Sequence, residues 1–193
     1  MTKSDWRRVI DEAKPLGIEI VQFIGGEPTM HPDLPGFVDH ALAHGISVEI
    51  YSNLLHVRPA LWDTLSRPDV RLATSYYTDD AAQHEAITQG RGSHARTRSN
   101  IIEMVRRSIP LRVGIVDVHN GQRVDQAHAE LASLGVTDIG YDRVRQVGRG
   151  VRGRVARGLR LALRVLPLVV SGQCPRAVAR GHRCRRPLPM CTG

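Results

Sequence analysis

The sequence predicts an α/β fold built on a parallel sheet, and three observations support this prediction. Helix-like and strand-like stretches alternate along residues 1–142, in the order α β α β α β α β α β. The strand-like stretches are short and mostly apolar, as is typical of strands covered on both faces. Glycine or proline stands at most of the boundaries between stretches. Parallel strands with right-handed helical connections form either a (β/α) barrel or an open doubly wound sheet, and this order fits both.

The first part of the chain predicts two helices and two strands. Ser4 is a suitable N-cap for a helix over residues 5–14, and a nearly all-apolar strand follows over residues 18–24. A helix over residues 33–44 begins at an aspartate and ends at a glycine, and a strand over residues 47–51 comes next. The apolar residues of the first helix share one face: Trp6, Val9, Ile10 and Ala13.

The remaining elements continue the alternation. Helical segments are expected over residues 59–66, 79–107 and 123–134, and strands over residues 70–76, 111–118 and 138–143. Because the chain opens on a helix, we expect the first strand of such a sheet to be missing, together with the loop at its carboxyl end. Ligands bind at the carboxyl ends of the strands in both candidate architectures, so this loop matters for function.

Charge divides the chain into two segments. Residues 1–142 carry 14 basic and 19 acidic side chains, a net charge of −5, whereas residues 143–193 carry 13 arginines and no acidic residue. Of these last 51 residues, 42 are Arg, Val, Gly, Leu, Ala or Pro, which GC-rich codons encode. A shifted reading frame in GC-rich DNA gives such a composition. We therefore predict a folded domain over residues 1–150 and an unstructured, low-complexity, Arg-rich tail over residues 151–193.

An alternative for the tail is a basic amphipathic helix over residues 151–165 that binds phosphates or anionic lipid. Its arginines do not fall on one face, and no aromatic residue is available there to stack on bases, so we expect no specific nucleic-acid partner. The longest apolar run, residues 161–170, contains Arg164 and is far short of a membrane span. Together with the lack of a signal-peptide pattern, this predicts a cytoplasmic protein without a membrane partner.

The most informative motif is Gly25-Gly26-Glu27-Pro28, directly after an apolar strand. Two glycines at the end of a strand let the backbone approach a ligand closely. Glu27 places a carboxylate beside that backbone, where it suits a cationic amine. The alternative is a plain tight turn. The motif is neither a phosphate-binding P-loop nor a dinucleotide fingerprint, because it lacks the residues that define them.

In this context the motif resembles the second strand of radical S-adenosylmethionine (radical SAM) enzymes, and most closely the branch with a C-terminal SPASM or twitch extension. The strand ending in Ser52-Asn53 is similar to the third strand of that family, and Ser75 lies where the fourth strand presents a serine. Residues 145–150 are similar to the segment after the sixth strand. The resemblance implies a partial (β/α)6 barrel of the TIM type that lacks its first strand.

The resemblance also implies a cofactor, a reaction and a substrate class. In the family, the Gly-Gly-Glu-Pro segment binds the amino group of S-adenosylmethionine, and polar residues of the next two strands reach its ribose and carboxylate. The cofactor-binding residues implied here are Gly25, Gly26, Glu27, Pro28, Ser52, Asn53 and Ser75. The implied reaction is reductive cleavage of S-adenosylmethionine to a 5′-deoxyadenosyl radical that modifies a peptide or protein. Tyr77 and Thr88 depart from the family pattern, so no carboxylate-binding arginine is assigned.

The family's 4Fe–4S cluster is held by a C-x-x-x-C-x-x-C loop that precedes the helix beginning here near Ser4. No cysteine precedes Gly25, and Cys174, Cys184 and Cys191 are too widely spaced for a cluster or zinc motif. We therefore expect this chain alone to bind no cluster, to release no 5′-deoxyadenosine and to bind the cofactor weakly or not at all. No catalytic or metal-binding residue is assigned. A truncated, frame-disrupted remnant without activity is the alternative, and a basic nucleic-acid-binding module is a third.

Three other clusters suggest chemistry less strongly. His40 and His44 form an i, i+4 pair, but without a carboxylate on the same helix face they predict a surface pair rather than a metal site. Asp79 and Asp80 suit the N-cap of a helix better than an acid/base dyad. Ser75 lacks the sequence context of a nucleophile.

Overall fold

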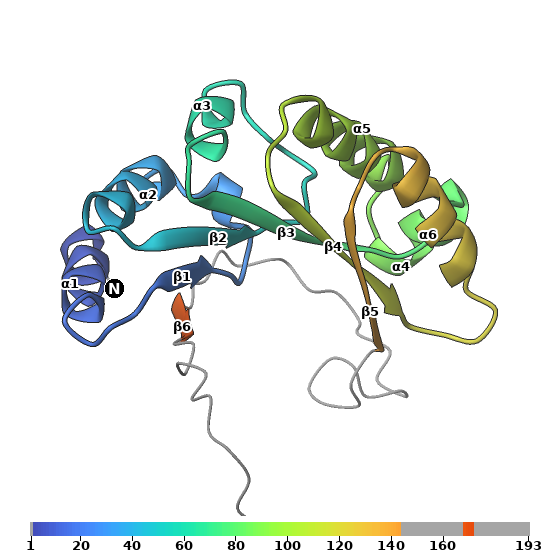
Figure 1. Ribbon diagram of the computed structural model, residues 1–193. Helices are drawn as coiled ribbons and strands as arrows, with labels where there is room; N and C mark the ends of the chain where they lie inside the picture. Colours follow the sequence, from blue (N-terminus) through green and yellow to red (C-terminus); the bar gives the residue numbers. More distant parts are fainter. Residues whose placement is uncertain (1, 144–167, 172–193) are drawn as a thin grey trace, which may run out of the picture.

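The computed structural model describes residues 2–143 and 168–171, which form one arched sheet with helices along its convex face (Figure 1). The strand order is β5-β4-β3-β2-β1-β6. The parallel strands are β1 (Ile20–Phe23), β2 (Ser47–Tyr51), β3 (Val70–Tyr76), β4 (Leu111–Asp117) and β5 (Asp138–Arg143). The helices are α1 (Lys3–Ala13), α2 (Leu34–Ala43), α3 (Leu61–Leu65), α4 (Ala81–Thr88), α5 (Ser93–Arg106) and α6 (Val124–Ser133).

This arrangement separates the two architectures that the sequence left open. A doubly wound sheet carries helices on both faces, whereas the helices of a (β/α) barrel lie outside the curved sheet. Here the strands follow one another in chain order, and the helices cover the convex side (Figure 1). The α/β class and the partial barrel are thus confirmed.

Most element boundaries agree with the sequence pattern, and the differences have local causes. The strands predicted over residues 47–51, 70–76 and 138–143 match β2, β3 and β5. The prediction of Ser4 as the first N-cap is wrong. Thr2 is the N-cap, because its side chain accepts from the Asp5 N–H while the Asp5 carboxylate accepts from the Thr2 N–H. This capping box takes Ser4 into the helix.

The core lies between the sheet and the convex-side helices. Strand side chains such as Val21, Ile50 and Val113 are fully buried there against helix residues such as Ile10 and Phe37. Burial of each large apolar side chain contributes about 1.5–3 kcal/mol. This core fixes the sheet's curvature and leaves the concave face for other interactions.

A polar row crosses the concave face from β1 to β4. Glu49, only 6% exposed, accepts from Gln22 and from Arg71, whose Nε lies 3.0 Å from the carboxylate. Arg112 approaches the same carboxylate at 3.7 Å. Residues from four neighbouring strands thus surround one nearly buried carboxylate. The row is separate from the carboxyl ends of the strands, which carry the predicted site.

The structure adds one strand that the sequence analysis did not predict. Within the Arg-rich tail, β6 (Leu168–Ser171) pairs antiparallel with β1. Its β-branched valines favour a strand, and it satisfies backbone groups at the β1 edge. The predicted boundary at residue 150, the segment 145–150, the alternative helix over residues 151–165 and all three cysteines lie outside the described residues. None of the described helices has the length and apolar composition needed to cross a membrane.

Candidate functional site

The predicted cofactor-binding residues meet at the carboxyl ends of β1, β2 and β3. A cavity of about 770 Å³ opens there, within the range of small-molecule sites. Its walls come from the turn after β1, the ends of β2 to β4 and the facing sides of α4 and α5. Five of the predicted residues line it: Gly25, Gly26, Glu27, Asn53 and Ser75.

The turn after β1 needs both of its glycines. Gly25 has φ +97° and Gly26 has φ +57°, which are backbone conformations that residues with a Cβ rarely adopt. Both residues line the cavity, so their backbone groups form part of its wall. Pro28 is buried and begins the short 3-10 helix η1 (Pro28–Met30), which fixes the exit of the chain.

Glu27 joins the ends of β1 and β2 through its carboxylate. Oε1 accepts from the Ser52 hydroxyl at 2.7 Å and from Thr29, whose hydroxyl lies at 2.7 Å and whose N–H lies at 3.1 Å. Oε2 accepts from the Asn53 N–H at 2.8 Å. Each carboxylate oxygen has about two acceptor positions, so Oε2 keeps capacity for a further donor. A contact with a ligand amine stays a prediction.

Ser52 and Asn53 have different surroundings, although they are neighbours. Ser52 is 1% exposed, and its hydroxyl both donates to Glu27 and accepts from the Leu54 N–H at 3.0 Å. Ser52 therefore stabilises the turn from within and does not line the cavity. Asn53 lines the cavity, and its carbonyl oxygen accepts from Thr97 of α5 at 3.0 Å.

Two tyrosines and Ser75 form the polar floor of the cavity. The hydroxyls of Ser75 and Tyr51 are hydrogen-bonded at 2.9 Å, and Tyr77 lies next to them in the lining. Burial, with a smaller effect of Tyr51, raises the pKa of Tyr77, so its hydroxyl stays protonated at neutral pH. Ser75 is bonded to a phenol and not to a base, in agreement with the sequence argument against a nucleophile.

His84 of α4 also lines the cavity, and sequence reasoning missed it. The residue is 2% exposed, and its Nδ1 is a buried nitrogen without a hydrogen-bond partner among the described residues. Its ring contacts Tyr76, Tyr77 and His94, with centroids 5.2 to 5.4 Å away. Burial lowers the pKa of His84, and His94 adds to the effect, whereas a hydrogen bond to the Thr78 backbone opposes it. The ring is neutral at neutral pH and offers a polar atom beside the cavity.

A pH dependence of stability follows from this burial. The folded-state pKa of His84 lies below the ordinary value of 6.5, so the unfolded chain takes up the proton first as the pH falls. The contribution of neutral, buried His84 to the free energy of unfolding is therefore complete above pH 6.5, and it is lost as the pH falls toward the folded-state pKa. We expect H84Q to flatten the decline of the free energy of unfolding below pH 6.5, measured by urea denaturation. H119Q, at an exposed histidine, is the control, and equal slopes in both variants contradict the assignment.

The acidic pair ahead of α4 is structural. Asp80 caps the helix by accepting from the Gln83 N–H at 2.7 Å, as the sequence predicted. Asp79 instead pairs with Arg123, whose Nη2 lies 2.6 Å from the carboxylate. That hydrogen bond lowers the pKa of Asp79. The two carboxylates therefore do not form an acid/base dyad.

Comparison with known proteins identifies the family of this chain. The profile of the Radical SAM superfamily matches residues 1–133. PqqA peptide cyclase of Xanthomonas campestris pv. campestris is 29% identical over 162 residues, which are 81% of this chain and 42% of the relative. PqqA peptide cyclase of Streptomyces rochei is 30% identical over the same length, which is 43% of that protein. The chain thus spans about two fifths of the length of these curated relatives.

Solved structures share the fold at low sequence identity. Streptococcus suis SuiB bound to the precursor peptide SuiA has a TM-score of 0.65 at 16% identity, over 80% of this chain and 35% of that one. The anSMEcpe structure with bound AdoMet, which is S-adenosylmethionine, has a TM-score of 0.63 at 11% identity, over 74% of this chain and 43% of that one. Because the family profile covers well over half of the chain, this protein belongs to the radical SAM superfamily.

Proposed function

We propose that the cavity at the carboxyl ends of β1 to β4 binds S-adenosylmethionine. One observation carries the proposal: residues assigned separately on three strands converge on one cavity, and the Glu27 carboxylate ties two of those strand ends together. Related folds support the ligand, since SuiB and anSMEcpe have been crystallised with S-adenosylmethionine bound. The His84 Nδ1 gives the cavity a buried polar atom without a protein partner, as expected where a ligand completes the hydrogen bonding.

The residues of the site divide into two groups. Gly25 and Gly26 offer backbone groups, and Asn53 and Ser75 offer polar side chains, to the methionine and ribose portions of the ligand. The free acceptor position on Glu27 Oε2 suits the ligand's ammonium group. Ser52 and Pro28 act as positioning residues, because both are buried within the turns that present the others.

In this family the bound cofactor supplies a 5′-deoxyadenosyl radical when a reduced 4Fe–4S cluster lies beside it. The described residues contain no cysteine, so the thiolate ligands of such a cluster are not among them. We therefore assign the described domain cofactor binding and substrate placement, and derive no electron-transfer step from it. A peptide substrate is proposed because the curated relatives are peptide cyclases and SuiB binds a precursor peptide.

Cofactor binding is tested on the purified full chain by equilibrium dialysis with S-adenosylmethionine. We expect weak, saturable binding, because the described residues hold no cysteine for the iron chelate that strengthens binding in the family. S75A should weaken binding severalfold without unfolding the chain, since the side chain is small and makes one described hydrogen bond. G26V should abolish binding, because a β-branched residue at φ +57° distorts the turn.

G140A is the matched glycine control. Gly140 lies on β5, its φ is not positive, and a Cβ added there meets no atom within 4 Å. This variant should bind as the wild type does. Absence of binding in the folded wild type contradicts the proposal and favours the inactive remnant. Equal binding by wild type and S75A contradicts the placement of the ligand.

A further inference from the structure

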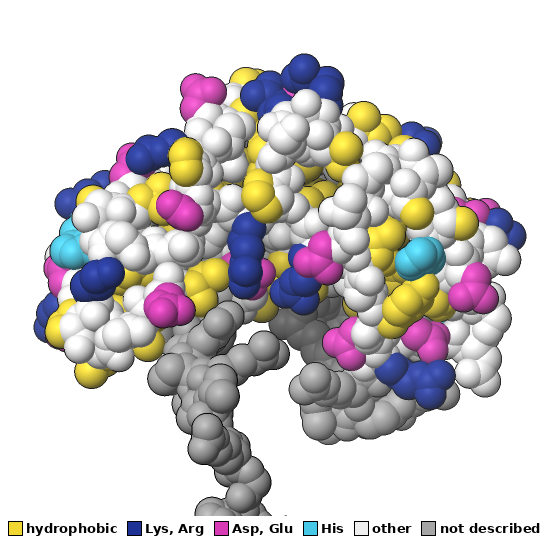
Figure 2. Space-filling model, viewed as in Figure 1, with side chains coloured by type: hydrophobic (Ala, Val, Ile, Leu, Met, Phe, Trp, Pro, Cys, Tyr) yellow, Lys and Arg dark blue, Asp and Glu magenta, His cyan; other side chains and the backbone are white. Residues whose placement is uncertain are grey.

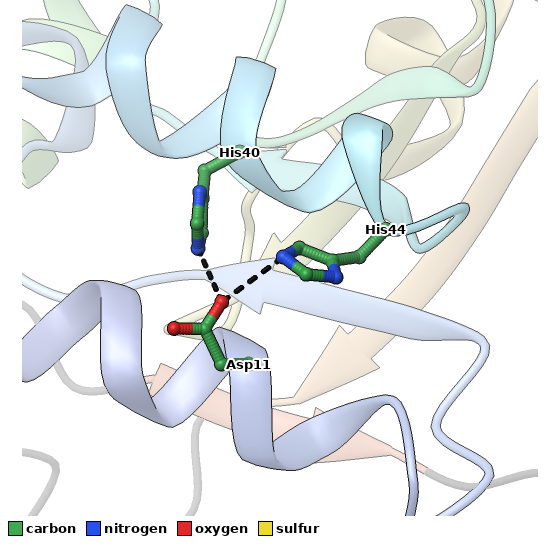
Figure 3. A group of neighbouring side chains, drawn as sticks. All are labelled: Asp11, His40 and His44. Atoms are coloured by element: carbon green, nitrogen blue, oxygen red, sulfur yellow. Dashed lines mark hydrogen bonds and ion pairs between the residues drawn. The ribbon is translucent and has the colours of Figure 1, made fainter.

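A second site lies on the convex side of the sheet, where α1 and α2 pack together. Asp11 of α1 faces His40 of α2 and His44, the C-cap residue of that helix, and the three side chains point toward one another (Figure 3). Both Nε2 atoms approach the same carboxylate oxygen, at 2.6 Å for His40 and 3.0 Å for His44. One potential ligand atom from each residue lies within 4.8 Å of the other two. This cluster belongs neither to the cavity nor to the Gly-Gly-Glu-Pro turn.

The geometry follows from the helices. Residues four apart lie on the same helix face, so the two imidazoles share a surface of α2 and their ring centroids are 4.9 Å apart. The carboxylate that this face of α2 lacks comes from α1, which lies alongside it (Figure 1). The expectation of a simple surface pair considered a carboxylate on the same helix only, and the structure adds one from the neighbouring helix.

We propose that Asp11, His40 and His44 bind a Zn²⁺ ion that links α1 to α2. Two imidazole nitrogens with one carboxylate oxygen are ligands that zinc takes, whereas Mg²⁺ and Ca²⁺ prefer oxygen alone. Zinc bonds of about 2.0–2.2 Å in tetrahedral geometry place neighbouring ligand atoms about 3.3 Å apart. The present separations from Asp11 Oδ1, 2.6 Å for His40 and 3.0 Å for His44, are shorter. The ion therefore enters after these side chains move apart by about 0.3–0.7 Å.

Solvent access favours this site. The side chains are 25% exposed for His40, 37% for His44 and 49% for Asp11, so they have room to adjust and a water can complete the coordination. On the space-filling surface, histidine lies uncovered at the α1 and α2 end of the molecule, among side chains of both charges (Figure 2). Lys3 and Asp33 already pair across the same two helices, so the metal adds a second link at this junction.

The test is calorimetric titration of the untagged full chain with Zn²⁺. A parallel titration uses a variant with Cys174, Cys184 and Cys191 replaced by serine, since thiolates also bind zinc. We expect the serine variant to retain one zinc ion with micromolar affinity. Adding D11N, H40A or H44A should raise the dissociation constant about tenfold or more. H119A, which removes an exposed histidine outside the cluster, should leave it unchanged.

A second readout is the midpoint of thermal unfolding. Zinc should raise it in the serine variant and raise it less after D11N, because a ligand that binds only the folded chain stabilises that state to an extent that grows with its affinity. No saturable binding to the serine variant overturns the proposal and leaves the cluster as a hydrogen-bonded ion pair. The proposal is also overturned if the serine variant carrying both D11N and H44A binds zinc as tightly as the serine variant alone.

Discussion

The variant E27Q is expected to lower the free energy of unfolding by about 1–3 kcal/mol and to remove cofactor binding. Both carboxylate oxygens of Glu27 accept hydrogen bonds, from Thr29, Ser52 and Asn53. Glutamine has one acceptor oxygen and a donor amide in place of the other. One of the strand-end donors therefore loses its partner or meets another donor, and the turn that positions Gly25 and Gly26 loosens. Urea denaturation measures the first effect, and equilibrium dialysis with S-adenosylmethionine measures the second.

Glu12 provides the matched control for this substitution. Its side chain is 68% exposed and takes part in a long ion pair with Arg8 at 3.8 Å. E12Q should change stability by less than about 0.5 kcal/mol, as is usual for surface positions. If E27Q is no more destabilising than E12Q, the carboxylate does not hold the ends of β1 and β2 together.

The variant Y76F is expected to cost about 1–3 kcal/mol of stability through a buried network on the helical side of β3. The fully buried Tyr76 hydroxyl donates to Glu130 at 2.8 Å and lies 2.8 Å from His94 Nε2. Burial, together with Glu130, raises the pKa of Tyr76, so the hydroxyl remains a donor. Phenylalanine keeps the ring but removes the hydroxyl that hydrogen-bonds to Glu130 Oε2 and His94 Nε2, so each of these atoms loses a partner.

Tyr141 is the corresponding control, because it is 58% exposed on β5. Y141F should leave the free energy of unfolding within about 0.5 kcal/mol of the wild type in urea denaturation. An effect of Y76F as small as that of Y141F would show that water replaces the lost hydroxyl, and that the network adds no stability.

Much of the fold is predictable from local sequence because strand runs and their boundaries are local features. The strands β2 and β3 follow from short stretches with apolar residues between turn residues, and β5 follows from its place after the helix that ends at Gly135. The bounds of all three agree with the prediction. The start of α1 was misplaced because Thr2 and Ser4 are both good N-caps, and the reciprocal bond of Asp5 decides between them. The curvature that makes the sheet a barrel wall depends on the packing of all the helices, which no single segment encodes.

The two sites differ in how far the sequence predicts them. Gly25, Gly26, Asn53 and Ser75 converge because the carboxyl ends of parallel strands meet at one edge, so their place follows from strand order. His84 and Asp11 have no such signal. Each acquires its role from an element that packs against its own helix, and a single histidine or aspartate on a helix is usually a surface residue.

Nuclear magnetic resonance of the ¹⁵N-labelled full chain, titrated with S-adenosylmethionine, tests the cofactor site most directly. We expect the backbone amide signals of Gly25, Gly26, Asn53 and Ser75 to shift progressively and to saturate together. Signals from the α1 and α2 junction, which lies across the sheet, should not move. A titration that leaves the four site signals unchanged, or shifts only signals elsewhere in the chain, would contradict the assignment of this cavity to the cofactor.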